Sequence, residues 1–267
     1  MDWIHSIIIA IVEGLTEYLP ISSTAHMIFT TNLLGVSEDD FVKMFQIAIQ
    51  FGAILAVVVL YHRKFLNFNN FRFYLKLIYA VIPALILGYL FNDKIEAVLE
   101  RPVPIAIVLV LGGLVLLFID RYFQNPKILS EQEISNKQAV IIGFWQCLAM
   151  MPGTSRSAAS IIGGMQQGLS RKAAAEFSFF LAVPTMAVAT AYSVFLKKWG
   201  ESGLRGYELI TQSSQHWYSF CIGNLVAFVV AMLAIKLFIG MIQKFGFKFW
   251  GWYRIIVGAL LLAYYTL

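Results

Sequence analysis

The chain has 267 residues, of which 59% are hydrophobic and only 13% are charged, and its formal net charge is +5. Soluble domains carry roughly 25% charged residues, so this composition excludes an ordinary soluble domain and indicates a polytopic membrane protein. For such a protein, the distribution of Lys and Arg between the two sides of the membrane is more informative than their total.

Apolar runs follow one another along the whole chain. Six are long enough to approach the ~20 residues of a spanning helix, at about 44–61, 74–91, 103–119, 175–196, 217–240 and 250–267. Four shorter runs form two pairs, 3–19 with 24–35 and 138–151 with 157–168. Because a turn at membrane depth is tolerated only where it lines a cavity or is buried in protein, each pair is expected to be a re-entrant hairpin. The predicted fold is an all-α integral membrane protein with about six full transmembrane helices and two re-entrant helical hairpins.

The two halves of the chain show the same order of runs. A shift of 132 residues places Pro20 on Pro152 and Ser23 on Ser155. We therefore expect a single membrane domain, 1–267, with repeat 1 at about 1–119, a linker at about 120–137 and repeat 2 at about 138–267. Three full spans per half are an odd number, so the second half enters the membrane from the opposite side. Such inverted-topology repeats place a site where broken helices meet near the midplane.

The positive charges predict an orientation for this arrangement. Twelve Lys and Arg residues fall on the side opposite the two termini, and six fall on the side of the termini. The positive-inside rule makes the more basic side cytoplasmic. Both termini are therefore expected outside the cell, with the first hairpin opening outward and the second inward.

The first hairpin gathers polar side chains within an apolar context. Glu13 and Glu17 are four residues apart and so share one face of a helix, which Pro20 ends because it lacks an N–H donor. A second helix is expected from about Ala25 to Leu34, where hydroxyl groups can cap its start. The polar residues around this start are Ser22, Ser23, Thr24 and His26.

Ionisable groups are costly at membrane depth, and they indicate a functional site there. Glu13 and Glu17 can hold a divalent cation or orient a histidine; the alternative is a pair of helix-end glutamates near the membrane surface. His26, near a hydroxyl and a carboxylate, completes the parts of an activated nucleophile. At least one of Ser22 and Ser23 is expected to be only a cap, and the sequence does not choose between them.

The second hairpin carries an arginine at its turn, in the segment MPGTSRS. Arg156 lies at the start of a helix expected from about Ala158, where free N–H groups and the helix dipole favour anions. Together with the hydroxyls of Thr154, Ser155 and Ser157, it can form a phosphate cradle. The alternative is a cation that extends to the membrane surface.

Four further polar signals are weaker. Glu176 and Ser178 begin a long span, and each either faces the site or caps a helix. Gln46 and Gln50 share a helix face and either support the site or link helices. Arg254, within WGWYR, is expected to anchor the chain at the membrane surface among the aromatic residues Trp250, Trp252 and Tyr253.

The segments EGLTEYLPISSTAH and MPGTSRS, in this order and at this separation, resemble the motifs of the bacterial undecaprenyl-diphosphate phosphatase family, the bacitracin-resistance phosphatases. The resemblance extends to EFSFFLAVP at 176–184 and YRIIVG at 253–258. It implies a phosphatase of the bacterial cytoplasmic (inner) membrane that hydrolyses undecaprenyl diphosphate to undecaprenyl phosphate and inorganic phosphate. It also implies recycling of this lipid carrier for cell-wall synthesis, resistance to bacitracin, dependence on Mg²⁺ or Ca²⁺, and a site open to the periplasmic face.

The resemblance also implies roles for the residues of both motifs. We expect Glu17, Ser23, His26 and Arg156 to be catalytic and Glu13 and Glu17 to hold the cation. Phosphate is expected to bind at Ser22, Thr24, Ser155, Arg156 and Ser157. In one mechanism Ser23 attacks with His26 as base, and in the rival one His26 activates water directly. The sequence departs from the family pattern at Gln46, where a glutamate is expected, and at Thr154, where a bulkier aromatic residue is common.

A transporter or flippase for prenyl phosphates is the alternative function, because inverted repeats with broken helices are typical of transporters. The carboxylate pair, serine, histidine and arginine together favour the enzyme. The expected partners are undecaprenyl diphosphate and the lipid bilayer, and not nucleic acid. The pairs Gly112–Gly113 and Gly163–Gly164 indicate close helix packing and make a homodimer an expectation.

Overall fold

The computed structural model describes residues 1–99, 101–200 and 202–266, and these residues form helices and turns without a β-strand. Leu267, the end of the last predicted apolar run, lies outside them. The first half of the chain forms α1 (Trp3–Thr16), α2 (Ser23–Leu33), α3 (Asp40–Ala48), α4 (Gln50–Leu60), α5 (His62–Phe65), α6 (Phe71–Leu99) and α7 (Pro102–Tyr122). The second half forms η1 (Glu131–Glu133), α8 (Asn136–Cys147), η2 (Leu148–Met150), α9 (Arg156–Gln166), α10 (Arg171–Ala191), η3 (Tyr192–Leu196), α11 (Gly206–Thr211), α12 (Ser214–Phe245) and α13 (Lys248–Thr266).

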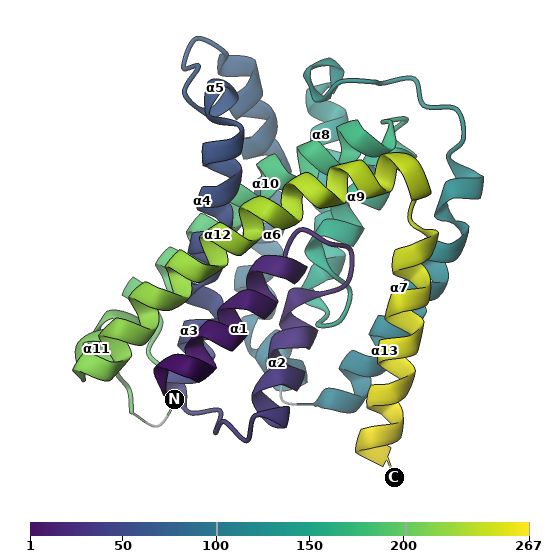
Figure 1. Cartoon of the computed structure of the whole chain (residues 1–267). Coiled ribbons are helices and arrows are strands. Elements are labelled where there is room, and N and C mark those ends of the chain that lie inside the picture. Colours follow the sequence, from purple (N-terminus) through teal and green to yellow (C-terminus); the bar gives the residue numbers. More distant parts are fainter. Residues whose placement is uncertain (100, 201, 267) are drawn as a thin grey trace.

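The predicted all-α membrane protein is confirmed. Among the described residues, five helical segments are long and apolar enough to cross a membrane, at 40–60, 71–91, 102–122, 171–196 and 214–245. They correspond to five of the six predicted spans, and the sixth run forms α13, a helix of 19 residues. At 1.5 Å per residue, the 32 residues of α12 extend about 48 Å. This exceeds a ~30 Å hydrocarbon core, and α12 crosses the molecule obliquely in Figure 1.

The four short helices form two hairpins that approach each other from opposite ends of the molecule. Helix α1 starts at the end that holds both termini, turns back near mid-height, and continues as α2 (Figure 1). Helix α8 starts at the other end, turns back near mid-height, and continues as α9. This is the arrangement expected for the two hairpins, whose placement in the membrane stays a prediction.

In both turns, a serine with positive φ caps the N-terminus of the next helix. Ser22 has a φ of 70° and Ser155 a φ of 74°, and they are the only described non-glycine residues with positive φ. Each hydroxyl accepts a hydrogen bond from the backbone N–H three residues later, at Ala25 and Ala158. A left-handed serine is strained, so its recurrence at one position of each hairpin supports the predicted inverted repeat, which stays a prediction.

These caps change the alignment of the two halves by one residue. Ser22 corresponds to Ser155, which requires a shift of 133 residues instead of the predicted 132. The prediction aligned two prolines, but the backbone conformation aligns the two caps. With the corrected shift, Ser23 corresponds to Arg156, and Glu13 corresponds to Gln146.

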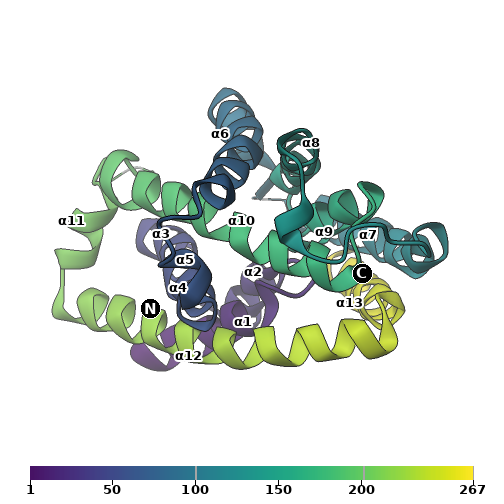
Figure 2. The same cartoon turned by 90° about the horizontal axis from the view of Figure 1, so that it is seen from above.

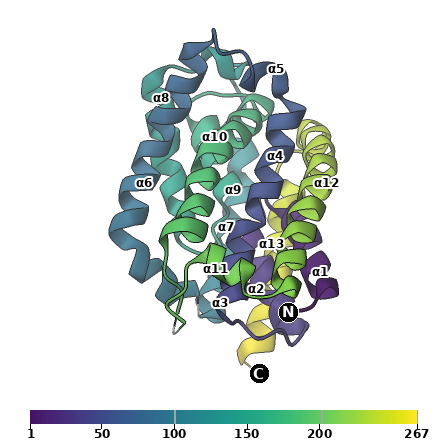
Figure 3. The same cartoon turned by 90° about the vertical axis from the view of Figure 1, so that its left-hand side faces the viewer.

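Helix α10 lies at the centre of the bundle. Viewed from above, it separates α6 and α8 on one side from α12 on the other (Figure 2), and the side view in Figure 3 agrees. Helix α1 packs along α12, α8 packs along α6, and α7 pairs with α13. Buried aromatic side chains of α10, including Phe177, Phe179 and Phe180, fill the space around it. Both hairpin turns are thereby held against α10.

Candidate active site

The two hairpin turns bring a carboxylate, a hydroxyl and a guanidinium into one cluster. Glu17 lies just after α1, and Ser23 is the first residue of α2. The Ser23 hydroxyl donates a hydrogen bond to Glu17 Oε2 at 2.5 Å. From the second hairpin, Arg156 Nη2 donates to Glu17 Oε1 at 2.9 Å. The side chains of Glu17 and Arg156 are only 4% and 13% exposed, so this ion pair is buried.

Arg156 is held from two further sides. Its Nη1 donates to the backbone oxygen of Ser178 on α10 at 2.8 Å, and its guanidinium lies 5.8 Å from the ring centre of Tyr18. Ser178 thus faces the site, which was one of the two alternatives for it. The Nε of Arg156 is buried without a hydrogen-bond partner, so one donor of the guanidinium remains for a ligand oxygen.

The other hydroxyls of the second turn tie the two turns together. Ser157 Oγ donates to the backbone oxygen of Leu19 at 2.7 Å, and Ser155 Oγ donates to the same oxygen at 3.4 Å. Their expected phosphate-binding role stays a prediction, since both hydroxyls already have partners within the protein. Ser22 is occupied similarly as the cap of α2, which leaves Ser23 as the hydroxyl paired with a carboxylate.

His26 does not pair with Ser23 in the structure. Its Nδ1 lies 2.8 Å from the backbone oxygen of Ser22, and its Nε2 lies 2.9 Å from the hydroxyl of Tyr253. A carbonyl oxygen can only accept, so Nδ1 carries the proton and, in the neutral ring, Nε2 accepts from Tyr253. The imidazole is directed toward α13, and the structure gives Ser23 a different acceptor, Glu17.

Glu13 lies one turn before Glu17 and is fully buried, and neither of its carboxylate oxygens has a hydrogen-bond partner. A buried carboxylate without a hydrogen-bond partner needs a cation or a proton to neutralise its charge. Among the described residues, no group of three or more His, Cys, Asp or Glu could hold a metal ion. Glu13 and Glu17 nevertheless fit Mg²⁺ or Ca²⁺, since these ions take oxygen ligands and Mg²⁺ commonly binds one or two carboxylates together with substrate phosphates.

A cavity of about 480 Å³ opens from this cluster. At its polar end lie Glu17, Ser23, Thr24 and Arg156. Gln46 and Gln50 also line it, and the Nε2 of Gln46 is buried without a partner. The remaining wall includes an apolar stretch from α6 and the second hairpin, formed by Ala84, Gly88, Ile95, Ala149 and Met150.

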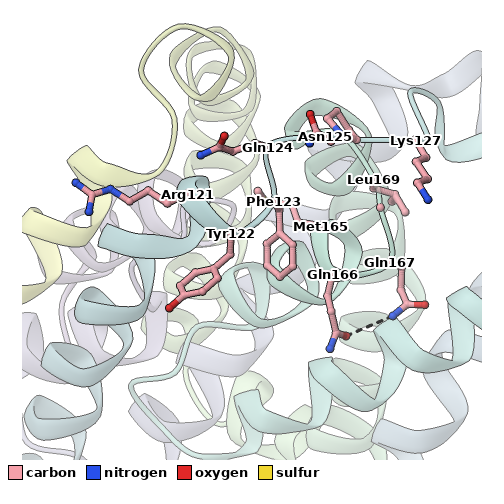
Figure 4. Close-up of a pocket in the computed structure, with 12 residues that line it drawn as sticks. Arg121, Tyr122, Phe123, Gln124, Asn125, Lys127, Met165, Gln166, Gln167 and Leu169 are labelled. Atoms are coloured by element: carbon pink, nitrogen blue, oxygen red, sulfur yellow. Dashed lines mark hydrogen bonds between the residues drawn. The ribbon is translucent and has the colours of Figure 1, made fainter.

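A second cavity of about 470 Å³ lies where α7 and α9 end (Figure 4). Its polar side chains come from the ends of these helices and from the loops that follow them, and the amides of Gln166 and Gln167 are hydrogen-bonded to each other there. Its lining residues, all of them described, include no carboxylate and no histidine. The first cavity is therefore the candidate active site.

The prediction for Arg254 was wrong. Its side chain is fully buried in the bundle and not anchored at the membrane surface. The aromatic neighbours on which the prediction relied behave differently from one another: Trp250 is buried, Trp252 is exposed, and Tyr253 contacts His26. The signal that could have located Arg254 is its position inside an apolar run, where a cation is usually held by the protein interior.

The fold and the site together define a multi-pass membrane protein with a buried cluster of a carboxylate, a hydroxyl and a guanidinium at the turns of two hairpins. Residues 6–260 match the family model described as bacitracin resistance protein BacA. A Flavobacterium psychrophilum protein named undecaprenyl-diphosphatase is 52% identical over 98% of this chain and 95% of its own length. Proteins of the same name from Wolinella succinogenes and Bdellovibrio bacteriovorus are 44% and 42% identical; the first match covers both chains fully, and the second covers 98% of this chain and 95% of its relative. This chain belongs to the bacitracin resistance protein family.

The buried ion pair makes a stability prediction. Replacement of Arg156 by Ala should lower the free energy of unfolding by about 3–5 kcal/mol, because it leaves Glu17 buried without its counter-charge. Thermal unfolding in detergent measures this effect. Arg171→Ala is the matched control: it removes an ion pair to Asp120 whose arginine is 39% exposed, and such pairs contribute about 0–1 kcal/mol. Adding Glu17→Gln to Arg156→Ala should restore part of the loss. Equal effects of the two arginine substitutions would contradict the prediction.

Proposed function

We propose that this chain is an undecaprenyl-diphosphatase, which hydrolyses undecaprenyl diphosphate to undecaprenyl phosphate and inorganic phosphate and thereby recycles the lipid carrier. The observation that carries this proposal is the Glu17–Ser23–Arg156 cluster at the polar end of a partly apolar cavity. A diphosphate needs concentrated positive charge and a positioned nucleophile, whereas its prenyl chain needs apolar surface. Bacitracin resistance follows from the family to which the chain belongs.

In the proposed reaction, Ser23 Oγ attacks the terminal phosphorus while its proton passes to Glu17 Oε2, which already accepts its hydrogen bond. The new Oγ–P bond forms as the anhydride P–O bond breaks, and the bond electrons go to the oxygen of undecaprenyl phosphate. Water then attacks the phosphorus of the phosphoserine and breaks the Oγ–P bond. Phosphate leaves, and Glu17 returns the proton to Ser23 Oγ. Arg156 binds the terminal phosphate throughout, and its unpartnered Nε is the donor available for this contact.

Glu13 and Glu17 are the residues that would hold a divalent cation. Such an ion neutralises charge on the phosphate oxygens when bound. Glu13 is suited to this role because its oxygens have no other partner. The proposed prenyl site is the apolar wall of the cavity, where Ala84, Gly88 and Met150 bring α6 and the second hairpin together.

The transporter or flippase reading lacks a comparable observation. Transport of a prenyl phosphate requires an anion site, which Arg156 alone can supply, but it does not require a buried serine hydrogen-bonded to a carboxylate. Direct activation of water by His26 remains the rival enzymatic mechanism. The Glu17–Ser23 contact favours serine attack, since His26 is engaged by Tyr253 instead.

Purified protein should release phosphate from a prenyl diphosphate in the presence of Mg²⁺ or Ca²⁺, and chelation of the cation should abolish this release. Arg156→Lys and Glu17→Gln should each lower kcat roughly 100-fold or more, since removal of one well-placed charge or donor has effects of this size. Arg171→Lys, which changes an arginine far from the hairpin turns, should retain wild-type activity. Normal phosphate release in both site variants would refute the proposed site.

Serine attack predicts a covalent intermediate. Rapid acid quench during turnover, followed by mass spectrometry, should identify a phosphoserine at Ser23. Ser23→Ala should show neither the modification nor phosphate release, whereas His26→Gln should still form the phosphoserine. If His26 activates water directly, the wild type forms no phosphoserine, and His26→Gln is as inactive as Ser23→Ala.

The proposed location is the bacterial cytoplasmic membrane, with both termini outside and the site open to the periplasmic face. The distribution of Lys and Arg supports this orientation, and the two termini lie at one end of the structure (Figure 1). A C-terminal fusion to a reporter that is active only outside the cytoplasm should be active. Activity of a reporter that works only in the cytoplasm would contradict the orientation.

A further inference from the structure

Arg254 joins the two hairpin turns to α7 through five backbone carbonyls. Its Nη1 donates to the oxygens of Pro20 at 3.0 Å and of Thr154 at 2.9 Å. Its Nη2 donates to Gly153 at 2.7 Å and to Val108 at 3.4 Å, and its Nε donates to Leu109 at 3.1 Å. Pro20 belongs to the first turn, Gly153 and Thr154 belong to the second, and the other two oxygens belong to α7. All five N–H donors of a guanidinium thus find an acceptor.

Burial of the Arg254 charge costs free energy, which its hydrogen bonds must offset. Arg254 is 0% exposed, and among the described residues no carboxylate forms an ion pair with it. A charge buried without a counter-ion is tolerated only when its hydrogen bonds are complete. The oxygens of Pro20, Gly153 and Thr154 would otherwise be unsatisfied, since turns outside regular helices leave backbone oxygens without partners. The guanidinium and the two turns consequently stabilise each other.

The carbonyls lie next to the catalytic groups along the chain. Pro20 stands between Glu17 and Ser23, and Thr154 is two residues before Arg156. The contacts of Glu17 with Ser23 and Arg156 are 2.5 and 2.9 Å long, so a small shift of either turn would break them. Arg254 itself does not line the cavity, and it is therefore separate from the groups that would touch the substrate.

We propose that Arg254 is a positioning residue, which fixes the two turns relative to each other so that Glu17, Ser23 and Arg156 meet in reactive geometry. The inference rests on the proposed diphosphatase activity. It assigns to α13 the task of joining both halves of the site, while Tyr253, the preceding residue, holds His26.

Two neighbouring glycines of α7 allow the guanidinium to be displaced without changing its charge. A methyl group at Gly112 would overlap Nη2 and lie 2.7 Å from Cζ of Arg254. Displacement of these atoms breaks the hydrogen bonds of the guanidinium to the two turns. A methyl group at Gly113 would instead lie 2.8 Å from the backbone oxygen of Gly251, 2.9 Å from Cγ1 of Ile255 and 3.0 Å from Cβ of Arg254. It strains the α7–α13 contact without overlapping the guanidinium.

The experiment compares Gly112→Ala with Gly113→Ala in the intact protein, with prenyl diphosphate as substrate. Gly112→Ala should lower kcat on the order of 100-fold, as expected for a misplacement of reacting groups by about 1 Å. Its KM should change much less, and its melting temperature should fall, because the buried guanidinium loses hydrogen bonds. Gly113→Ala should also lower the melting temperature, but it should keep a wild-type kcat per folded molecule.

A wild-type kcat in Gly112→Ala, or an equal loss of kcat in Gly113→Ala, would overturn the assignment. If Gly112→Ala fails to fold, Arg254→Lys decides: a lysine offers three donors in place of five, so kcat should fall more than KM. Wild-type kcat in Arg254→Lys would then refute the proposal. A wild type that releases no phosphate would refute the proposed function itself, whereas an active wild type with an equally active Gly112→Ala would refute only the role of Arg254.

Discussion

The structure depends on one buried ion pair that crosses between the two halves of the chain. Glu17 comes from the first hairpin and Arg156 from the second, and their side chains are 4% and 13% exposed. Neither charge is stable at this depth alone, because desolvation without a partner costs several kcal/mol. The two hairpins must therefore meet before either turn has a low-energy conformation, and the site exists only in the assembled bundle.

The backbone of the turns imposes the second constraint. Residues 17–22 and 151–155 lie outside regular helices, and protein groups must accept or donate the hydrogen bonds that water would otherwise supply. The hydroxyls of Ser155 and Ser157 bind the oxygen of Leu19, and Arg254 binds those of Pro20, Gly153 and Thr154. Polar side chains at both turns thus satisfy the backbone, including two serines whose phosphate-binding role stays a prediction.

Much of this site could be predicted from the sequence, because an ionisable residue in an apolar run has few explanations. Glu17 and Arg156 were predicted from that rule and Ser23 from the family resemblance, and the structure brings the three together. The partners of His26 and Arg254 could not be predicted, since they depend on how α13 packs against residues at least 100 positions away. The predicted alignment of the two halves paired Pro20 with Pro152, whereas the left-handed caps pair Ser22 with Ser155 and shift it by one residue.

The corrected register explains why the two hairpins differ at equivalent positions. The first residue after the cap is a serine in one half, Ser23, and an arginine in the other, Arg156. Two serines would leave Glu17 without a counter-charge, and two arginines would leave it without a hydroxyl partner. The same reasoning applies one helical turn earlier, where buried Glu13 corresponds to buried Gln146. A second carboxylate at position 146 would add another buried negative charge. Gln146 instead bonds neutrally to Thr185. The difference between the two hairpins thus keeps the number of buried unpaired charges low, and it places a hydroxyl and a guanidinium on the same carboxylate, Glu17.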